Sequence, residues 1–241
     1  MIIPAFNEEA RLPITLNATR EYLQERFPEQ CEILVVDDGS ADATAHITAE
    51  FAKHYPDVPV SVLSYGCNRG KGYAVRYGML HASGDWRLFC DADLATPIEE
   101  FAVIFDRMKV DGTEIGIGSR PLKQSNLLVH QPWYREQLGR GFNKVVQMLA
   151  VPGIQDTQCG FKIFSAAAAT NVFQHCKLDK FAFDAEALLI ATRLGYRISE
   201  VPIRWSHKDG SKISLVRDGS RMVCDLLRIR MLHKGLKRVV K

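Results

Sequence analysis

Short apolar runs alternate with segments of helical periodicity over the first half of this 241-residue chain. The runs "MIIP" and "CEILVVDD" are rich in β-branched residues and stop at polar ones, which is typical of strands, whereas Leu12, Leu16 and Leu23 recur between them at helical spacing. The same alternation continues, with strands predicted at residues 58–65, 85–93 and 114–120 and helices at residues 41–55, 70–82 and 97–108. This pattern indicates βαβ units, so we expect a single α/β domain on a mostly parallel sheet.

Polar residues follow four of the predicted strands. The clusters are "PAFNEE" at 4–9, "DDGS" at 37–40, "DAD" at 91–93 and "GSR" at 118–120. In parallel sheets, ligands bind beyond the carboxyl ends of the strands. One such cluster would be weak evidence, because Asp and Ser commonly cap helices. Four clusters at successive strand ends favour a binding site along one edge of the sheet.

Asp91 and Asp93 lie one residue apart directly after an apolar strand. Two carboxylates so close cost free energy unless a positive charge lies between them. The residues leave three possibilities open: a metal ion, a cationic side chain, or water at an exposed turn.

Composition excludes several classes of protein. With 46% hydrophobic and 24% charged residues, the chain is an ordinary globular one. It contains neither a run long enough to span a membrane nor the pattern of a signal peptide. Its six cysteines are scattered without a CxxC pair, which predicts a reducing compartment and no cysteine-bound metal.

The positive charge is concentrated at the C-terminus. From Arg217 onward there are eight Lys or Arg against two Asp, a net +6, while the whole chain carries +3 and the remainder is therefore net −3. A nucleic-acid-binding protein usually spreads basic residues over its folded body, so we expect no nucleic-acid partner.

The basic C-terminal segment also has helical periodicity. Apolar residues recur at Met222, Leu226, Ile229, Leu232 and Leu236. A basic amphipathic helix of this kind lies on an anionic membrane surface, and the alternative is a helix packed on the domain with its basic face in water. We therefore divide the chain into one folded domain at residues 1–215 and a basic amphipathic helix at residues 216–241.

Motifs along nearly the whole chain resemble those of family 2 glycosyltransferases, which have the GT-A fold. In the first half they are "PAFNEE", "VVDDGSADAT", "NRGKGYAVRYGM", "DADLATP" and "GSR". In the second half, "GRGFNKVVQMLAVPGIQDTQCGFKIF", "FAFDAEALLIATRLGYRISEVPIRW" and "GSKISLVRDGSRMVCDLLRIR" are similar to the branch that loads a sugar onto a polyprenyl phosphate. Within that branch the motifs are most similar to those of dolichyl-phosphate β-glucosyltransferases.

The resemblance implies a donor site for UDP-glucose and a divalent cation, Mg²⁺ or Mn²⁺, which prefers oxygen ligands and stabilises the charge of a departing diphosphate. Asp93 is the implied metal ligand, and Asp91 lies by the nucleotide and helps to hold the metal. The other implied nucleotide-sugar-binding residues are Pro4, Phe6, Glu8, Asp37, Asp38, Lys71 and Lys212. A solvated lysine is the alternative for Lys71.

A phosphate acceptor would explain the arginines. A phosphate monoester is ionised at neutral pH, so its enzyme needs cations to hold the nucleophile more than it needs a base. Arg120 and Arg135 are implied to bind the acceptor phosphate, with Arg140 as a third candidate, and solvated arginines on a surface helix are the alternative for Arg135. Three acidic residues recur in the family pattern: Asp156, Asp184 and Glu186. We count Asp156 among the catalytic residues without assigning it as a base.

The resemblance therefore implies an inverting, metal-dependent transfer of glucose from UDP-glucose to a dolichyl-type polyprenyl phosphate. The alternatives are a mannosyltransferase that uses GDP-mannose and a non-catalytic domain that binds a nucleotide sugar. We expect the protein in the cytoplasm, bound peripherally to the cytosolic face of a membrane through its C-terminal helix.

Overall fold

The computed structural model describes residues 1–28, 30–129, 133–208 and 215–238, and within 133–142 and 215–223 it describes the course of the helix but few side chains. The strands are β1 (Ile2–Ala5), β2 (Ile33–Asp37), β3 (Val60–Ser64), β4 (Trp86–Cys90), β5 (Ile115–Ser119), β6 (Asn126–Val129), β7 (Phe161–Ser165), β8 (Ile198–Pro202) and β9 (Arg204–Ser206). The helices are α1 (Leu12–Arg26), α2 (Thr44–His54), α3 (Lys71–His81), α4 (Glu100–Asp111), α5 (Trp133–Leu149), α6 (Ala166–Phe173), α7 (Phe183–Leu194) and α8 (Leu215–Leu232).

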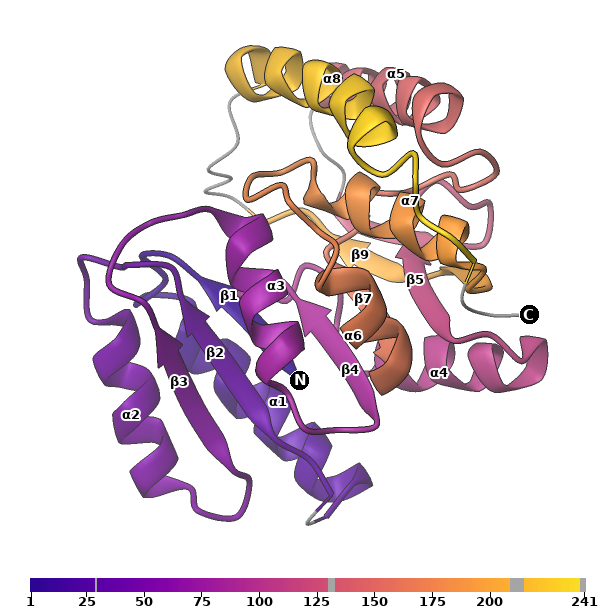
Figure 1. The fold of residues 1–241 in the computed structure, drawn as a ribbon. Coiled ribbons are helices and arrows are strands. Elements are labelled where there is room, and N and C mark those ends of the chain that lie inside the picture. The colour runs from indigo at the N-terminus through magenta and orange to yellow at the C-terminus, as the bar shows by residue number, and fades with distance from the viewer. Residues whose placement is uncertain (29, 130–132, 209–214, 239–241) are drawn as a thin grey trace.

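A seven-stranded sheet forms the centre of the molecule (Figure 1), in the order β3-β2-β1-β4-β7-β5-β8. The strands are parallel except β7, which runs antiparallel to both β4 and β5. The predicted mostly parallel α/β sheet is therefore confirmed. The sequence predicted a helix that starts at Pro97, and helix α4 begins three residues later, at Glu100.

Side chains alternate between the two faces of the sheet and build two hydrophobic clusters. Ile2 faces the cluster that includes α3, α6 and α7, whereas its neighbour Ile3 faces the cluster that includes α1, α2 and α4. This alternation follows from the two-residue period of a strand. Both faces are thus covered by helices, as parallel sheets require.

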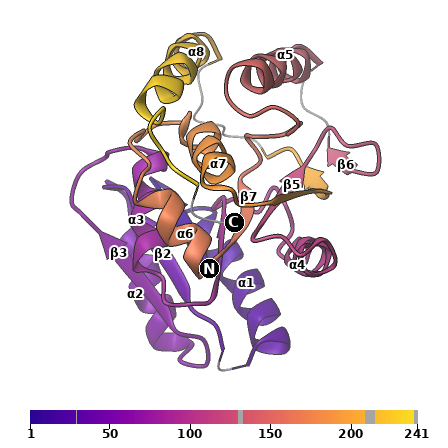
Figure 2. The same cartoon turned by 45° about the vertical axis from the view of Figure 1, so that its right-hand side comes forward.

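Two further pairs of elements lie outside these layers. Strands β6 and β9 form a small parallel sheet of their own. Helices α5 and α8 pack against each other, and α8 also packs on α7 (Figures 1 and 2). Helices α5 and α8 lie on the side toward which β4 and β5 point (Figure 1).

The C-terminal helix α8 uses its apolar face for packing. Leu226 and Ile229 are fully buried in the hydrophobic cluster that includes α3, α6 and α7, and Met222 and Leu236 pack against that cluster. The packed helix named as the alternative is therefore present. Leu227 and Met231, on the other side of α8, are 52% and 72% exposed. None of the helices in the described part of the chain is both long and apolar enough to span a membrane.

Candidate active site

The predicted polar clusters converge on one edge of the sheet. Because β1, β2, β4 and β5 point in the same direction, the residues that follow them share that edge. The reversed strand β7 starts at this edge, because Phe161 pairs with Cys90 at the end of β4. The loop before β7, residues 156–160, is thereby placed between the ends of β4 and β5.

Asp91 is held by a cation and by a close backbone contact. Lys71 Nζ, in the first turn of α3, lies 2.5 Å from Asp91 Oδ1, and the Asp91 amide donates to the Gly160 carbonyl oxygen at 3.1 Å. A Cβ on Gly160 would collide with the Asp91 carboxylate, so a larger residue there would displace Asp91 from its position beside Lys71. Burial alone would lower the pKa of Lys71, but Asp91 and Asp184 raise it, so Lys71 stays protonated.

Asp93 lies at the same turn, but its negative charge is less well balanced by a nearby cation. Its Oδ1 accepts the Ala95 amide at 3.0 Å, and Arg11 Nη1 lies 4.0 Å from its Oδ2. Burial, followed by the charge of Asp91, raises the pKa of Asp93. The turn therefore carries two carboxylates whose charge is only partly balanced by cations.

Asp91 and Asp93 suit a divalent cation. They offer oxygen ligands only, and their side chains are 37% and 25% exposed, so an ion has access to both. No cluster of three or more His, Cys, Asp or Glu in the described residues could hold a metal by itself. Further ligands would therefore come from substrate phosphates or water, which is usual for Mg²⁺.

Asp38 is saturated by hydrogen bonds within the protein. Its Oδ1 accepts from the Tyr65 hydroxyl at 2.8 Å and the Arg69 amide at 2.7 Å. Its Oδ2 accepts from Asn68 Nδ2 at 3.0 Å and the Gly70 amide at 2.8 Å. Asp38 thus fixes the turn that precedes Lys71.

Its neighbour Asp37 is buried and less fully engaged. Asp37 Oδ1 accepts the Ser40 amide at 3.0 Å, and its Oδ2 accepts the Ser64 hydroxyl at 3.3 Å. In the first cluster, the Glu8 carboxylate is bound by Arg11, with 2.7 Å between Oε2 and Nε. These contacts orient both acidic side chains.

A cavity of about 290 Å³ connects the ends of β1, β2 and β4. Four predicted nucleotide-sugar-binding residues besides Asp38 line it: Pro4, Phe6, Lys71 and Asp91. Lys180 and Phe181, from the loop before α7, line it as well; Phe181 begins one of the quoted motifs, whereas Lys180 lies just outside it.

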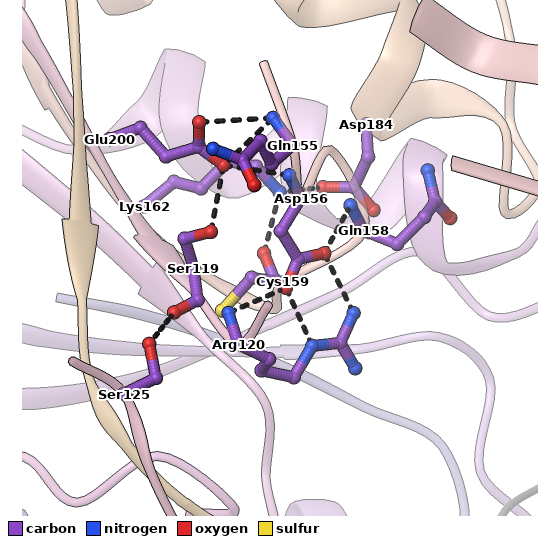
Figure 3. Close-up of polar contacts among 10 residues, drawn as sticks. All are labelled: Ser119, Arg120, Ser125, Gln155, Asp156, Gln158, Cys159, Lys162, Asp184 and Glu200. Atoms are coloured by element: carbon purple, nitrogen blue, oxygen red, sulfur yellow. Dashed lines mark hydrogen bonds and ion pairs between the residues drawn. The ribbon is translucent and has the colours of Figure 1, made fainter. Parts of the chain in front are cut away.

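Arg120 is clamped by Asp156 at the end of β5 (Figure 3). Arg120 Nε donates to Asp156 Oδ2 at 2.7 Å and Nη2 donates to Oδ1 at 2.8 Å, while the Arg120 amide also donates to Oδ2 at 3.0 Å. Asp156 is fully buried. Burial would raise the pKa of Asp156, but Arg120 outweighs it and the pKa is lowered.

Glu200 of β8 holds the Asp156 loop against the end of β5 (Figure 3). Its Oε1 accepts from the Ser119 hydroxyl at 2.8 Å and from the Asp156 amide at 2.7 Å, and its Oε2 accepts the Gln155 amide at 3.0 Å. Glu200 therefore ties the loop to β5 and so fixes the position of Arg120. Glu200 and Ser119 are 81 residues apart in the sequence, so no local motif indicates that they interact.

A second buried ion pair lies beside the site. Lys162 of β7 and Asp184 of α7 are both buried and form a direct ion pair, and Lys162 Nζ also donates to the Cys159 carbonyl oxygen at 2.6 Å. Glu186 instead accepts backbone amides of Lys177 and Leu178 and contacts His233 Nε2 at 2.7 Å. The "FDAE" acids thus organise the fold around the site.

Three predicted site residues cannot be placed in it. Lys212 lies outside the described residues. Arg135 and Arg140 are on α5, but their side chains lie outside the described part of the chain. Their roles remain predictions.

Comparison with known proteins identifies the family. Residues 1–173 match the model of "Glycosyl transferase family 2". A dolichyl-phosphate beta-glucosyltransferase of Trichomonas vaginalis is 39% identical over 241 aligned residues, which cover 97% of this chain and 73% of the relative. Its counterpart in Dictyostelium discoideum is 38% identical, with coverage of 97% and 74%.

Solved structures show the same fold. Glucosyl-3-phosphoglycerate synthase of Mycobacterium tuberculosis, solved with Mn²⁺, UDP and its product, superposes with a TM-score of 0.65 at 19% identity, covering 98% of this chain and 79% of that one. The predicted GT-A fold is confirmed. From the family match and the identity to its relatives, the chain belongs to glycosyl transferase family 2.

Proposed function

We propose that this protein transfers glucose from UDP-glucose to a dolichyl-type polyprenyl phosphate, giving polyprenyl-phosphate β-glucose. The relatives that share 38% and 39% identity over 97% of the chain bear the name of this activity. One observation carries the proposal: Arg120 is fixed by Asp156 at the edge that also carries Asp91 and Asp93. A fixed guanidinium suits an anionic acceptor, and a metal ion bound to the carboxylate pair would offset the repulsion between those carboxylates and the acceptor.

The donor occupies the cavity at the ends of β1, β2 and β4. Pro4, Phe6 and Asp37 lie toward the base and ribose, and Lys71 and Asp91 lie toward the diphosphate. Asp93 holds Mg²⁺ or Mn²⁺, with help from Asp91. The cation, when bound, offsets the negative charge that develops on the departing UDP. Lys212 belongs to the same proposal as a contact of the donor phosphates.

The acceptor phosphate is held by arginines. Arg120 presents a rigid guanidinium because its Nε and Nη2 are fixed in the fork with Asp156. Guanidinium groups bind phosphate oxygens, and in Arg120 this contact is assigned to Nη1, because Nε and Nη2 are engaged by Asp156. Arg135 and Arg140 on the neighbouring helix α5 are assigned to the same phosphate.

The reaction needs no general base. An oxygen of the acceptor phosphate attacks the anomeric carbon, a new carbon–oxygen bond forms, and the bond to UDP breaks with its electron pair leaving on the diphosphate. No proton is lost from the nucleophile, because the phosphate is already ionised. A single displacement on an α-linked donor gives the β product. Asp156 acts as the partner of Arg120, since its lowered pKa makes it a poor proton acceptor.

The helix α8 binds the surface of an anionic membrane, on its cytosolic face. Its exposed apolar residues Leu227 and Met231 are accompanied by exposed basic residues. These basic residues are Arg228 and Arg230 of α8, with Lys234 and Lys237 in the segment directly after it. A surface of this composition suits an interface between headgroups and acyl chains. It would bring the sheet edge near a lipid-anchored phosphate.

The assignment is tested by offering labelled UDP-glucose, UDP-galactose and GDP-mannose separately, each with a polyprenyl phosphate and Mg²⁺. We expect label in the lipid fraction with UDP-glucose. Transfer from GDP-mannose alone would replace the donor assignment. Binding of UDP-glucose without transfer to any lipid phosphate would reduce the protein to a nucleotide-sugar-binding domain.

A further inference from the structure

We propose that Lys180 binds the diphosphate of the nucleotide donor. This inference rests on the proposed function, because it deepens the description of the donor site. Lys180 lies in the loop between α6 and α7 and lines the cavity together with Lys71, Asp91 and Asp38. No sequence motif indicated it.

The backbone that carries Lys180 is fixed. Arg76 of α3 donates from Nη1 to the Cys176 carbonyl oxygen at 2.9 Å and from Nη2 to Asp179 Oδ1 at 2.8 Å. The Tyr73 amide donates to the Asp179 carbonyl oxygen at 3.2 Å. The segment from Cys176 to Asp179, which directly precedes Lys180, is therefore bound to α3 at both of its ends.

The side chain of Lys180 crosses the turn that begins α3. A Cβ on Gly70 would lie 2.5 Å from the Asp179 carbonyl oxygen and 2.9 Å from Lys180 Cδ. Gly70 also has a φ of +112°, a conformation that other residues rarely adopt. The aliphatic part of Lys180 therefore packs over Gly70, and both residues line the cavity.

The charges of the cavity leave a role for this ammonium. Lys71 is paired with Asp91 at 2.5 Å, and Asp38 is saturated by four hydrogen bonds. Lys180 is exposed, and its side chain forms no hydrogen bond or ion pair within the described part of the chain, whereas its backbone carbonyl oxygen accepts the Phe183 amide at 3.3 Å. Of the two lysines that line this cavity, Lys180 is thus the one not already neutralised.

A diphosphate beside Asp91 and Asp93 would otherwise face two carboxylates. A metal ion offsets part of that repulsion, and a lysine that also lines the cavity offsets more of it without competing for the metal. The acceptor also carries a phosphate, so it offers Lys180 the same kind of ligand as the donor diphosphate. The cavity lies at the ends of β1, β2 and β4, whereas the clamped Arg120 follows β5, so the donor is the ligand we assign.

The test measures binding of UDP and of uridine to the full 241-residue chain by calorimetry, with Mg²⁺ and without acceptor. For Lys180→Ala we expect UDP affinity to fall about tenfold, near the lower end for a hydrogen bond to a charged group because the side chain is exposed. Uridine affinity should stay unchanged, since uridine has no phosphate. Lys180→Arg should retain most of the UDP affinity.

Lys177→Ala is the matched control, because Lys177 is an exposed lysine of the same loop that does not line the cavity. Equal UDP affinity in Lys180→Ala and Lys177→Ala would overturn the inference, as would a parallel loss for uridine. If UDP binding is normal but Lys180→Ala raises the KM for polyprenyl phosphate alone, the lysine serves the acceptor and the donor assignment is wrong.

The outcome for the proposed function is separate. If the wild-type chain binds GDP instead of UDP and Lys180→Ala weakens GDP tenfold, the role of Lys180 stands while the donor assignment fails. Binding of neither diphosphate by the wild-type chain would contradict both.

Discussion

Asp156 is best understood as the counter-ion of Arg120. Its two oxygens accept the Nε, Nη2 and backbone amide of that arginine, and it has no exposed surface. A carboxylate so engaged is committed to holding a cation. The sequence indicated both residues but not their pairing, because 36 residues separate them.

Asp156→Asn tests this role through the pH profile. Because its pKa is lowered, Asp156 is ionised throughout pH 5–8 and contributes no titration there. The rise of kcat/KM for the acceptor should instead follow the second ionisation of the phosphate, near pH 6, and level off above it. We expect Asp156→Asn to slow transfer by about 10 to 100-fold through loss of a charge-assisted contact and to keep the shape of the profile.

The control is Asp106→Asn, an exposed acid on α4 with a side chain 73% exposed. It should leave both rate and profile unchanged. Loss of the acidic limb in Asp156→Asn, or complete loss of activity in a folded variant, would identify Asp156 as a titrating base.

Asp93→Asn tests the metal ligand. The substitution is nearly isosteric but removes one of two carboxylates, so we expect Mg²⁺ or Mn²⁺ to lose its effect on UDP binding and transfer to fall below detection. Thermal unfolding should be close to that of the wild type, since the contacts described for Asp93 are modest: its Oδ1 accepts the Ala95 amide at 3.0 Å, and its Oδ2 lies 4.0 Å from Arg11 Nη1. Metal-stimulated UDP binding that persists in Asp93→Asn would remove the assignment.

At the scale of elements, local pattern predicted the first half well. Strands β1 to β5 and helices α1 to α4 follow apolar periodicity, and four polar clusters at their ends meet at one edge as expected. The insertion of β7 between β4 and β5 was not predicted. Strand order depends on pairing between distant segments, on which the periodicity of one segment carries no information.

That insertion decides the shape of the site. The reversed β7 brings the 156–160 loop to the catalytic edge, where Gly160 contacts Asp91 and Asp156 contacts Arg120. Lys180 and Glu200 reach their places through similar long-range packing. Lys180 lies just outside the quoted motifs, and Glu200 lies within one of them, but neither neighbourhood indicates the long-range contact that the residue makes.

The helix α8 carries its own prediction. Each exposed Lys or Arg contributes about 1 kcal/mol at an anionic membrane, so charge reversal at Arg228, Arg230, Lys234 and Lys237 should abolish flotation with anionic liposomes. Wild-type flotation should weaken with added salt and be absent with neutral lipid.

The matched control reverses four exposed basic residues on α1, α2 and α4: Arg26, Lys53, Arg107 and Lys109. This variant has the same net charge as the first but leaves α8 intact, so it should still float. If both variants float like the wild type, α8 serves only to pack on α5 and α7.

At the scale of the whole molecule, the site combines two halves of the chain. The donor cavity comes mainly from the ends of β1, β2 and β4, whereas Asp156 and the helices α5 and α8 come from the second half. The family model covers residues 1–173, so it includes both the carboxylate pair and the arginine clamp. The last third adds Lys180, Glu200 and the outer helix.

The most direct measurement compares two acceptors that differ only in the reacting group. Labelled UDP-glucose and Mg²⁺ are offered at pH 7.5, a value chosen to be about 1.5 units above the second phosphate pKa, with a polyprenyl phosphate or with the free polyprenol of the same length. We predict β-linked glucose on the phosphate and no product with the alcohol, because Arg120 binds an anion and Asp156 is not available as a base. Comparable transfer to the alcohol would contradict it.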